Sequence, residues 1–310
     1  WVLMAGILPG VIHGTGWTRS HLGAAVAALS HVENLPQRVP IMLAASLIAG
    51  AAVALGQLVL RALRLHAGLA PIERVPLGFA VGATGLEALT LIAGRLGLLA
   101  PWPVRIGLGA LIGLGWLLPV LIGFRRVRGA DHSHSVRTAD PTRETGPARL
   151  RFGRFGLSSL LLVTGPFVVL MALAAMQPTI EFDALEYHLQ GPKEIFLAGR
   201  IAFLPHNVYT SMPFGVEMLH LLGMEVLDDW YRGALAGQLL VMLHAPAAAV
   251  LVALTARRLA ASQAAWVAAV TYLTAPWIYR LAAIPFVEGP LCLYHAALIW
   301  AVAWDWHANR

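Results

Sequence analysis

The apolar stretch VPIMLAASLIAGAAVALGQLVL, residues 39–60, decides the fold of this chain. It contains no charged side chain and is long enough to cross the ~30 Å hydrocarbon core of a bilayer as a helix. In lipid, a helix satisfies every backbone N–H and C=O group within its own segment. Similar windows recur along the 310 residues. The chain is therefore predicted to be an all-α, polytopic helical membrane protein.

The composition supports the same class. Hydrophobic residues make up 58% of the chain and charged residues 12%, and the mean hydropathy is +0.70. Soluble domains carry about 25% charged residues. The net charge of +6 does not indicate a nucleic-acid partner, because most of the arginines lie in loops that flank the apolar windows, where they act as orientation signals next to membrane lipids.

The apolar windows predict seven membrane spans and one partial span, about 7–8 transmembrane helices in all. The last two full spans follow each other closely and should form a tight hairpin. The predicted spans are residues 39–60, 76–99, 104–124, 157–176, 233–256, 264–282 and 284–304, with the partial span at 1–12.

The distribution of Lys and Arg predicts the orientation. The loops on one side carry 14 of the 22 Lys and Arg residues, so that side is expected to be cytoplasmic. Residues 177–232 then form an extracytoplasmic loop of a protein in the cytoplasmic membrane. We expect three parts: an N-terminal transmembrane bundle (1–124), a basic cytoplasmic linker (125–156) and a second transmembrane unit (157–310).

Several isolated features carry little functional weight. The chain begins at Trp1 rather than Met, which suggests a fragment of a longer protein, and its single cysteine, Cys292, excludes an internal disulfide. His132 and His134 have the spacing of a weak metal pair, and we interpret them as solvated loop residues. Glu87 lies within a predicted span, where a charge facing lipid is costly, so we expect it to have a partner inside the bundle.

The loop 177–232 contains eight of the chain's 16 acidic residues. Within it, Asp183 and Glu186 have the spacing of a helix N-cap and its third helical position, so Asp183 could simply cap a helix. Further short amphipathic helices are expected to start near Pro192 and Pro213 and to lie along the membrane surface. Carboxylates beside the phenol of Tyr187 in a partly dry pocket could also serve as a general base with hydrogen-bonding partners.

The run Phe182–Leu189, followed by Gly191-Pro192-Lys193 and Gly199, resembles the first large extracytoplasmic loop of GT-C type membrane glycosyltransferases. That superfamily includes the protein O-mannosyltransferases and the aminoarabinose transferases that act on lipid A. Downstream, the resemblance extends to a Pro-x-x-x-Glu element, a basic pair, a proline and the start of a later span, and it covers roughly residues 157–304. These elements are Pro213 with Glu217, Arg257-Arg258, Pro276 and Ile284–Glu288.

The resemblance implies inverting transfer of a hexose or pentose from a polyprenyl-phosphate sugar to an acceptor, which could be a lipid, a glycan or a protein. It implies Asp183 as the base, assisted by Glu186, with no cofactor and no metal. Two positions depart from the family pattern: Ala184 stands where many members have Glu, and Glu288 where they have Asp. The residues expected to bind substrate are Tyr187, His188, Lys193, Glu217, Arg280 and Glu288.

The sequence leaves two other functions open, a secondary transporter and a non-catalytic scaffold. A secondary transporter would place ionisable residues at mid-membrane depth, and Glu87 is the clearest such residue. A non-catalytic membrane scaffold would tolerate replacement of Asp183. A structural alternative also exists for two of the candidate binding residues, because Arg280 and Glu288 could form a buried ion pair.

Overall fold

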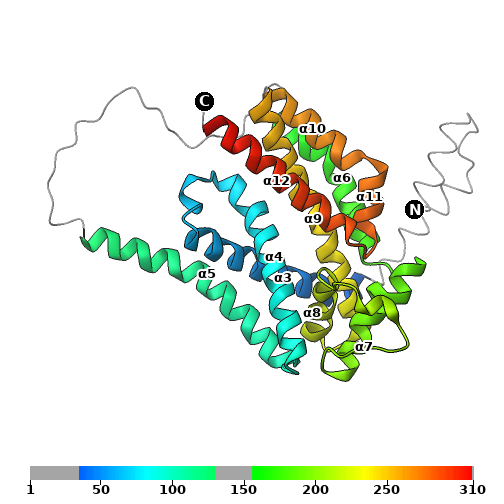
Figure 1. The fold of residues 1–310 in the computed structure, drawn as a ribbon. Helices are drawn as coiled ribbons and strands as arrows, with labels where there is room; N and C mark the ends of the chain where they lie inside the picture. Colours follow the sequence, from blue (N-terminus) through cyan, green and yellow to red (C-terminus); the bar gives the residue numbers. More distant parts are fainter. Residues whose placement is uncertain (1–34, 130–155, 261, 309–310) are drawn as a thin grey trace, which may run out of the picture. The chain divides into compact units, whose positions relative to one another are not determined.

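The computed structural model describes residues 35–129, 156–260 and 262–308, and every regular element in those ranges is helical. The chain divides into two compact units, residues 1–40 and 41–310. Of the first unit the structure describes only the opening of α3, and the packing described below lies within the second unit. The long helices (Figure 1) are α3 (Leu35–Ala62), α4 (Pro71–Arg95), α5 (Pro101–Gly129), α6 (Leu157–Ala175), α7 (Gln190–Ala198), α8 (Glu217–Leu227), α9 (Trp230–Leu259), α10 (Ser262–Thr274), α11 (Pro276–Ala283) and α12 (Glu288–Ala308).

The predicted all-helical fold is confirmed for the described residues. Four helices among them are long and apolar enough to cross a membrane, which is compatible with a membrane protein, and they overlap the first, second, fourth and fifth predicted spans. A count of seven to eight spans is not confirmed within the described residues, and the partial span at 1–12 lies outside them. The four helical segments are Pro36–Ala62, Pro71–Arg95, Ser158–Ala175 and Trp230–Leu259.

The predicted span at 264–282 is wrong as a single helix. The structure divides it into α10, which ends at Thr274, and α11, which starts at Pro276. Ala275 between them is extended, with ψ at 124°. Proline has no N–H to donate and its ring disfavours helical geometry in the residue before it. Pro276 therefore ends one helix and takes the first position of the next.

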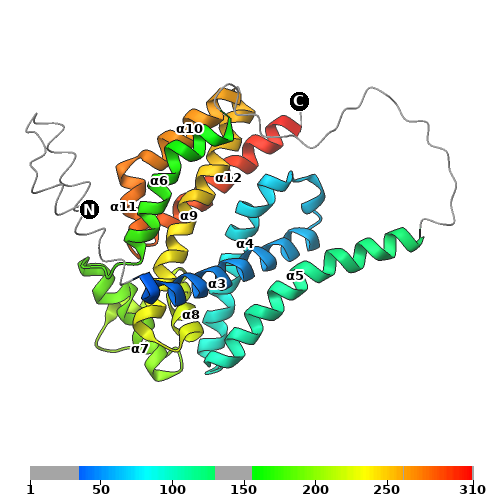
Figure 2. The same cartoon turned by 180° about the vertical axis from the view of Figure 1, so that it is seen from behind.

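Helix α9 is the centre of the described packing. It contacts α8, α12, α10, α4, α11 and α6, and Figures 1 and 2 both show it beside α6, α10 and α12. Its closest approach is to α8, where Gly223 and Gly233 bring the two backbones together. A Cβ placed on Gly233 would overlap the backbone of Met224 and come within 2.7 Å of the Gly223 carbonyl carbon. Small residues at such crossings allow helices to pack closely.

The exposed polar face expected of the helix after Pro213 is not observed, while its position along the membrane surface stays a prediction. Helix α8 packs against α9, α4, α7 and α5, and its polar residues are buried along with the apolar ones. Glu217 is 3% exposed, His220 0% and Glu225 2%. The amphipathic pattern indicated one wet face, but helices from distant parts of the sequence cover both faces. A buried carboxylate needs a partner or a proton. The buried acids of α8 therefore make this helix a candidate functional element.

Polar contacts connect the helices before the linker to those after it. Arg258 on α9 lies 2.5 Å from Glu73 on α4, and the Arg105 guanidinium on α5 donates to the Val226 carbonyl on α8 at 2.8 Å. Glu73 also accepts a hydrogen bond from the backbone N–H of Ala70 at the start of α4. These contacts hold α4 and α5 against α8 and α9. The division into a bundle at 1–124 and a unit at 157–310 stays a prediction, and most of the linker lies outside the described residues.

Candidate functional site

Asp183 lies in a short helical segment that follows α6. The segment continues as a π-helical turn, Ala184–His188, in which the Leu189 N–H donates to the Ala184 carbonyl at 2.9 Å. Ala184 and His188 point inward and are buried, while Asp183 is exposed. Single π-turns of this kind occur frequently at functional sites.

The predicted capping role of Asp183 is not observed. Its backbone is helical, with φ at −60° and ψ at −36°, and its side chain makes no capping hydrogen bond. A capping residue needs extended backbone geometry so that its side chain can reach the next N–H groups. Because the chain is already helical at Phe182, Asp183 does not stand at the position of a helix N-cap. It is available for another partner.

His188 and Glu217 connect the π-turn to α8. Nδ1 of His188 lies 2.7 Å from Oε1 of Glu217, and both side chains are buried. Removing one member of such a buried pair leaves the other desolvated and unpaired, which is costly. The pair therefore fixes the orientation of the π-turn that bears Asp183.

Tyr187 lies at the centre of the predicted residues. Its ring stacks on Tyr209 with centroids 5.2 Å apart and contacts the His188 ring at 4.2 Å. Burial, followed by the nearby carboxylates of Asp183, Glu217 and Glu288, raises the pKa of Tyr187. The phenol therefore stays protonated at neutral pH and can donate a hydrogen bond, although several carboxylates are near it. Five predicted residues (Asp183, Tyr187, His188, Glu217 and Glu288) are thus linked by the Tyr187–His188 and His188–Glu217 contacts and by the electrostatic effect of the three carboxylates on Tyr187, and they are here called the Tyr187 cluster.

The remaining predicted residues have other neighbours. The Arg280 guanidinium lies 2.8 Å from Oε1 of Glu181, just before the π-turn, and the Lys193 ammonium lies 4.1 Å from the centre of the Trp230 ring. Glu186 is half-buried. Within the described ranges, no hydrogen bond or ion pair joins Glu186 or Lys193 to the Tyr187 cluster. Arg280 is close to the π-turn through Glu181 and could supply positive charge there.

Glu87, a buried acid, was expected to have a partner inside the bundle, and one of its oxygens has none among the described residues. Glu87 of α4 is 9% exposed, and its Oε1 has no hydrogen-bond partner among the described residues. Its carboxylate interacts electrostatically with that of Glu217, whose Oε2 is likewise unpartnered there. Residue spacing could not reveal this pair, because 130 positions separate the two acids.

Replacing Glu87 with glutamine is expected to stabilise the protein. The amide is neutral without binding a proton, so it removes the cost of burying the acid and its electrostatic interaction with Glu217. A gain of about 1 kcal/mol, the scale of one buried polar interaction, corresponds to about 2–4 °C in the unfolding midpoint. Thermal unfolding in detergent measures the change, with Glu186→Gln as the control for loss of an acid in the same region. A lower midpoint for Glu87→Gln would contradict the repulsion.

Glu225 on α8 predicts a pH dependence of stability. Burial, with a smaller contribution from Asp228, raises the pKa of Glu225 from 4.5 to about 7. Between those values the folded protein keeps a proton that the unfolded chain releases, so stability is highest below pH 4.5 and falls as the pH rises towards 7. Glu225→Gln should remove this fall. The unfolding midpoints of the wild type and of Glu225→Gln are measured from pH 4 to 8. If the two curves run parallel, Glu225 does not cause the fall in stability.

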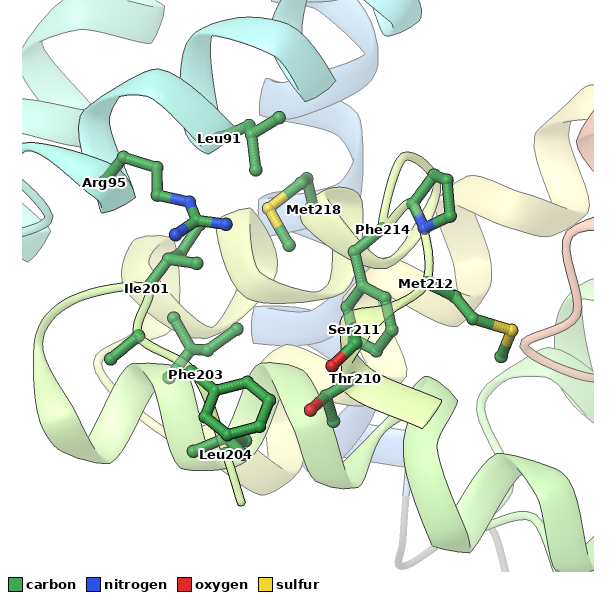
Figure 3. Close-up of a pocket in the computed structure, with 13 residues that line it drawn as sticks. Leu91, Arg95, Ile201, Phe203, Leu204, Thr210, Ser211, Met212, Phe214 and Met218 are labelled. Carbon is green, nitrogen blue, oxygen red and sulfur yellow. The ribbon is translucent and has the colours of Figure 1, made fainter. Parts of the chain in front are cut away.

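A pocket of about 430 Å³ lies next to the Tyr187 cluster, between the end of α4, α7 and the start of α8. None of the eight predicted site residues lines it. The lining is mostly apolar, with one arginine and two hydroxyl groups, and Figure 3 shows most of these side chains around the cavity. The lining residues are Leu91, Arg95, Ile195, Ile201, Ala202, Phe203, Leu204, Thr210, Ser211, Met212, Pro213, Phe214 and Met218.

Potential metal ligands are dispersed in the described part of the chain, where no three His, Cys, Asp or Glu side chains gather closely enough to hold a metal ion. His188 has Glu217 as its near neighbour, and His220 is buried with its pKa lowered by that burial to about 4, so its ring is neutral. The pair His132 and His134 lies outside the described residues.

Comparison with known proteins gives no further identification. No protein-family model, no curated protein and no solved structure matches this chain. The functional assignment therefore depends on the geometry of the Tyr187 cluster.

Proposed function

We propose that the protein is a membrane glycosyltransferase of the GT-C type. It transfers a sugar from a polyprenyl-phosphate donor to an acceptor on the extracytoplasmic side of the cytoplasmic membrane. The observation that carries the proposal is the exposed carboxylate of Asp183, which makes no capping hydrogen bond and lies just before a π-turn, in the segment that comes after the apolar helix α6. A donor with a lipid tail approaches within the bilayer, so its phosphate meets the protein at such a helix end.

Asp183 acts as the general base. The acceptor hydroxyl oxygen attacks the anomeric carbon, the bond from that carbon to the phosphate oxygen breaks, and the phosphate leaves with the electron pair. The acceptor proton passes to Asp183. This single displacement inverts the anomeric configuration, and positioned proton transfer contributes about 10²–10⁴-fold to such rates.

The neighbours of Asp183 have supporting roles. The buried His188–Glu217 pair holds the π-turn against α8, and the protonated Tyr187 donates a hydrogen bond to the acceptor or to a sugar hydroxyl. The leaving phosphate needs positive charge at the moment the bond breaks. Arg280, near the π-turn through Glu181, and Lys193, over Trp230, are the cations that supply it.

One observation favours a second candidate, a proton-coupled transporter. Glu87 and Glu217 are both buried and each has an oxygen without a hydrogen-bond partner in the described residues. Buried carboxylates on membrane helices often belong to proton or ion pathways. The exposed Asp183 and its surroundings have no role in that account, so the transferase is the better-supported function.

Reconstitution tests the proposal. Proteoliposomes receive a panel of polyprenyl-phosphate sugars with acceptors from membrane extracts, and released lipid phosphate is measured against empty liposomes. Release from at least one donor, dependent on acceptor, is the expected result. If no donor gives release while a proton gradient drives uptake of a solute, the transporter replaces the transferase.

A further inference from the structure

The 430 Å³ pocket beside the Tyr187 cluster has the chemistry of a ligand site. Known small-molecule sites occupy roughly 300–1,000 Å³ and combine an apolar lining with a few polar groups. Here the apolar side chains include Leu91, Phe203, Met212 and Met218, and the one cation is Arg95. Nothing in the proposed sugar transfer uses this space.

The polar groups are concentrated at opposite ends of the pocket. In Figure 3 the Arg95 guanidinium points towards Ile201 and Met218, and the hydroxyl groups of Thr210 and Ser211 lie across from it. Arg95 is exposed and makes no ion pair among the described residues. The Thr210 hydroxyl already donates to the Asn207 carbonyl at 2.7 Å. The positive charge available to a ligand is therefore that of Arg95, and its planar fork binds a carboxylate or a phosphate with two parallel hydrogen bonds.

The walls of the pocket are held in place by contacts of their own. The Ile201 N–H donates to the Gly94 carbonyl at 2.9 Å, which fixes the loop after α7 on the end of α4. On the other side, the Phe214 ring packs against Gly191 so closely that a Cβ there would come within 2.6 Å of it. A pre-formed pocket lowers the entropic cost of binding.

The pocket opens beside apolar surface at the end of a candidate span. Arg95 is the last residue of α4, and two other lining side chains of the pocket are well exposed, Phe203 at 72% and Met212 at 46%. A hydrocarbon chain can reach these side chains from the bilayer while its charged end stays at the interface. A soluble anion would gain nothing from them.

We propose that this pocket binds an amphiphile with one anionic group and a hydrocarbon chain, separate from the site of sugar transfer. The anionic group, a carboxylate or a phosphate, is held by Arg95. The chain lies against Leu91, Phe203, Met212 and Met218.

Binding of defined probes tests the proposal. The protein is placed in phosphatidylcholine nanodiscs, and native mass spectrometry counts the bound probe. The probes are dodecyl phosphate, dodecanoate, dodecanol and inorganic phosphate. Dodecyl phosphate or dodecanoate should bind with one molecule per chain, and comparison of the two identifies the preferred anionic group. Dodecanol binding as tightly as both anions, or inorganic phosphate displacing them at equal concentration, would overturn the proposal.

Matched variants locate the site. Arg95→Gln should weaken binding about tenfold or more, the loss expected for a hydrogen bond to a charged group. Arg200→Gln removes the same charge from an exposed position in the nearby loop that does not line the pocket, and it should bind as the wild type does. Leu91→Trp fills the pocket without changing its charge and should also abolish binding, which keeps the test valid if Arg95→Gln unfolds. Wild-type binding by both pocket variants would contradict the site.

Discussion

Asp183→Asn is expected to slow sugar transfer by about 10²–10⁴-fold, the range for loss of a general base. Asparagine keeps the size of the side chain but cannot accept the acceptor proton at neutral pH. The Asp183 carboxylate makes no capping hydrogen bond, so the substitution should leave the unfolding midpoint unchanged. The measurement is the initial rate of transfer in proteoliposomes at matched protein amounts.

Asp228→Asn is the control for this loss. Asp228 is an exposed acid of the same loop, it ends α8, and its φ of 55° is one that asparagine adopts readily. Its replacement should leave the rate within about twofold of the wild type, since surface changes have small effects. Equal rates for wild type, Asp183→Asn and Asp228→Asn would remove Asp183 from the reaction.

Gly233→Ala is expected to cause a large loss of stability. The added methyl group would meet the backbone of Met224 on α8, and backbone atoms cannot move aside as a flexible side chain can. The two central helices must separate, at a cost of roughly 1–3 kcal/mol or more. The unfolding midpoint in detergent should fall by about 5 °C or more.

Gly107→Ala is the matched control on α5. A Cβ at Gly107 meets nothing within 4 Å, and alanine is favoured over glycine inside a helix by about 0.5–1 kcal/mol. The midpoint of this variant should stay the same or rise slightly. If the unfolding midpoint fell equally in both variants, the close contact of α9 with α8 would not be the reason for glycine at position 233.

Much of the fold could be predicted from hydropathy alone. Uninterrupted apolar windows predicted α3, α4, α6 and α9, because a helix in lipid needs only length and apolar side chains. The break at Pro276 was missed because hydropathy counts proline as a mild residue and not as the end of a helix. The burial of α8 depends on which distant helices cover it, and this information is absent from its own eleven residues.

The candidate site could be predicted only where its residues are close in the sequence. Asp183, Tyr187 and His188 lie within six consecutive residues, and their proximity follows from their spacing. The contact of His188 with Glu217 crosses 29 positions, so only a family resemblance suggested that both belong to the site. Arg95 had no predicted role, because its place in a pocket depends on the loop after α7 folding back onto α4.

The most direct test of sugar transfer is the molar ratio of two products in one reaction. Wild-type proteoliposomes receive the active polyprenyl-phosphate sugar and its acceptor, and both free lipid phosphate and glycosylated acceptor are quantified over time. The single displacement at Asp183 predicts that the two appear together, one for one, with inverted anomeric configuration. Lipid phosphate released without glycosylated acceptor, or neither product from any donor, would contradict the transferase.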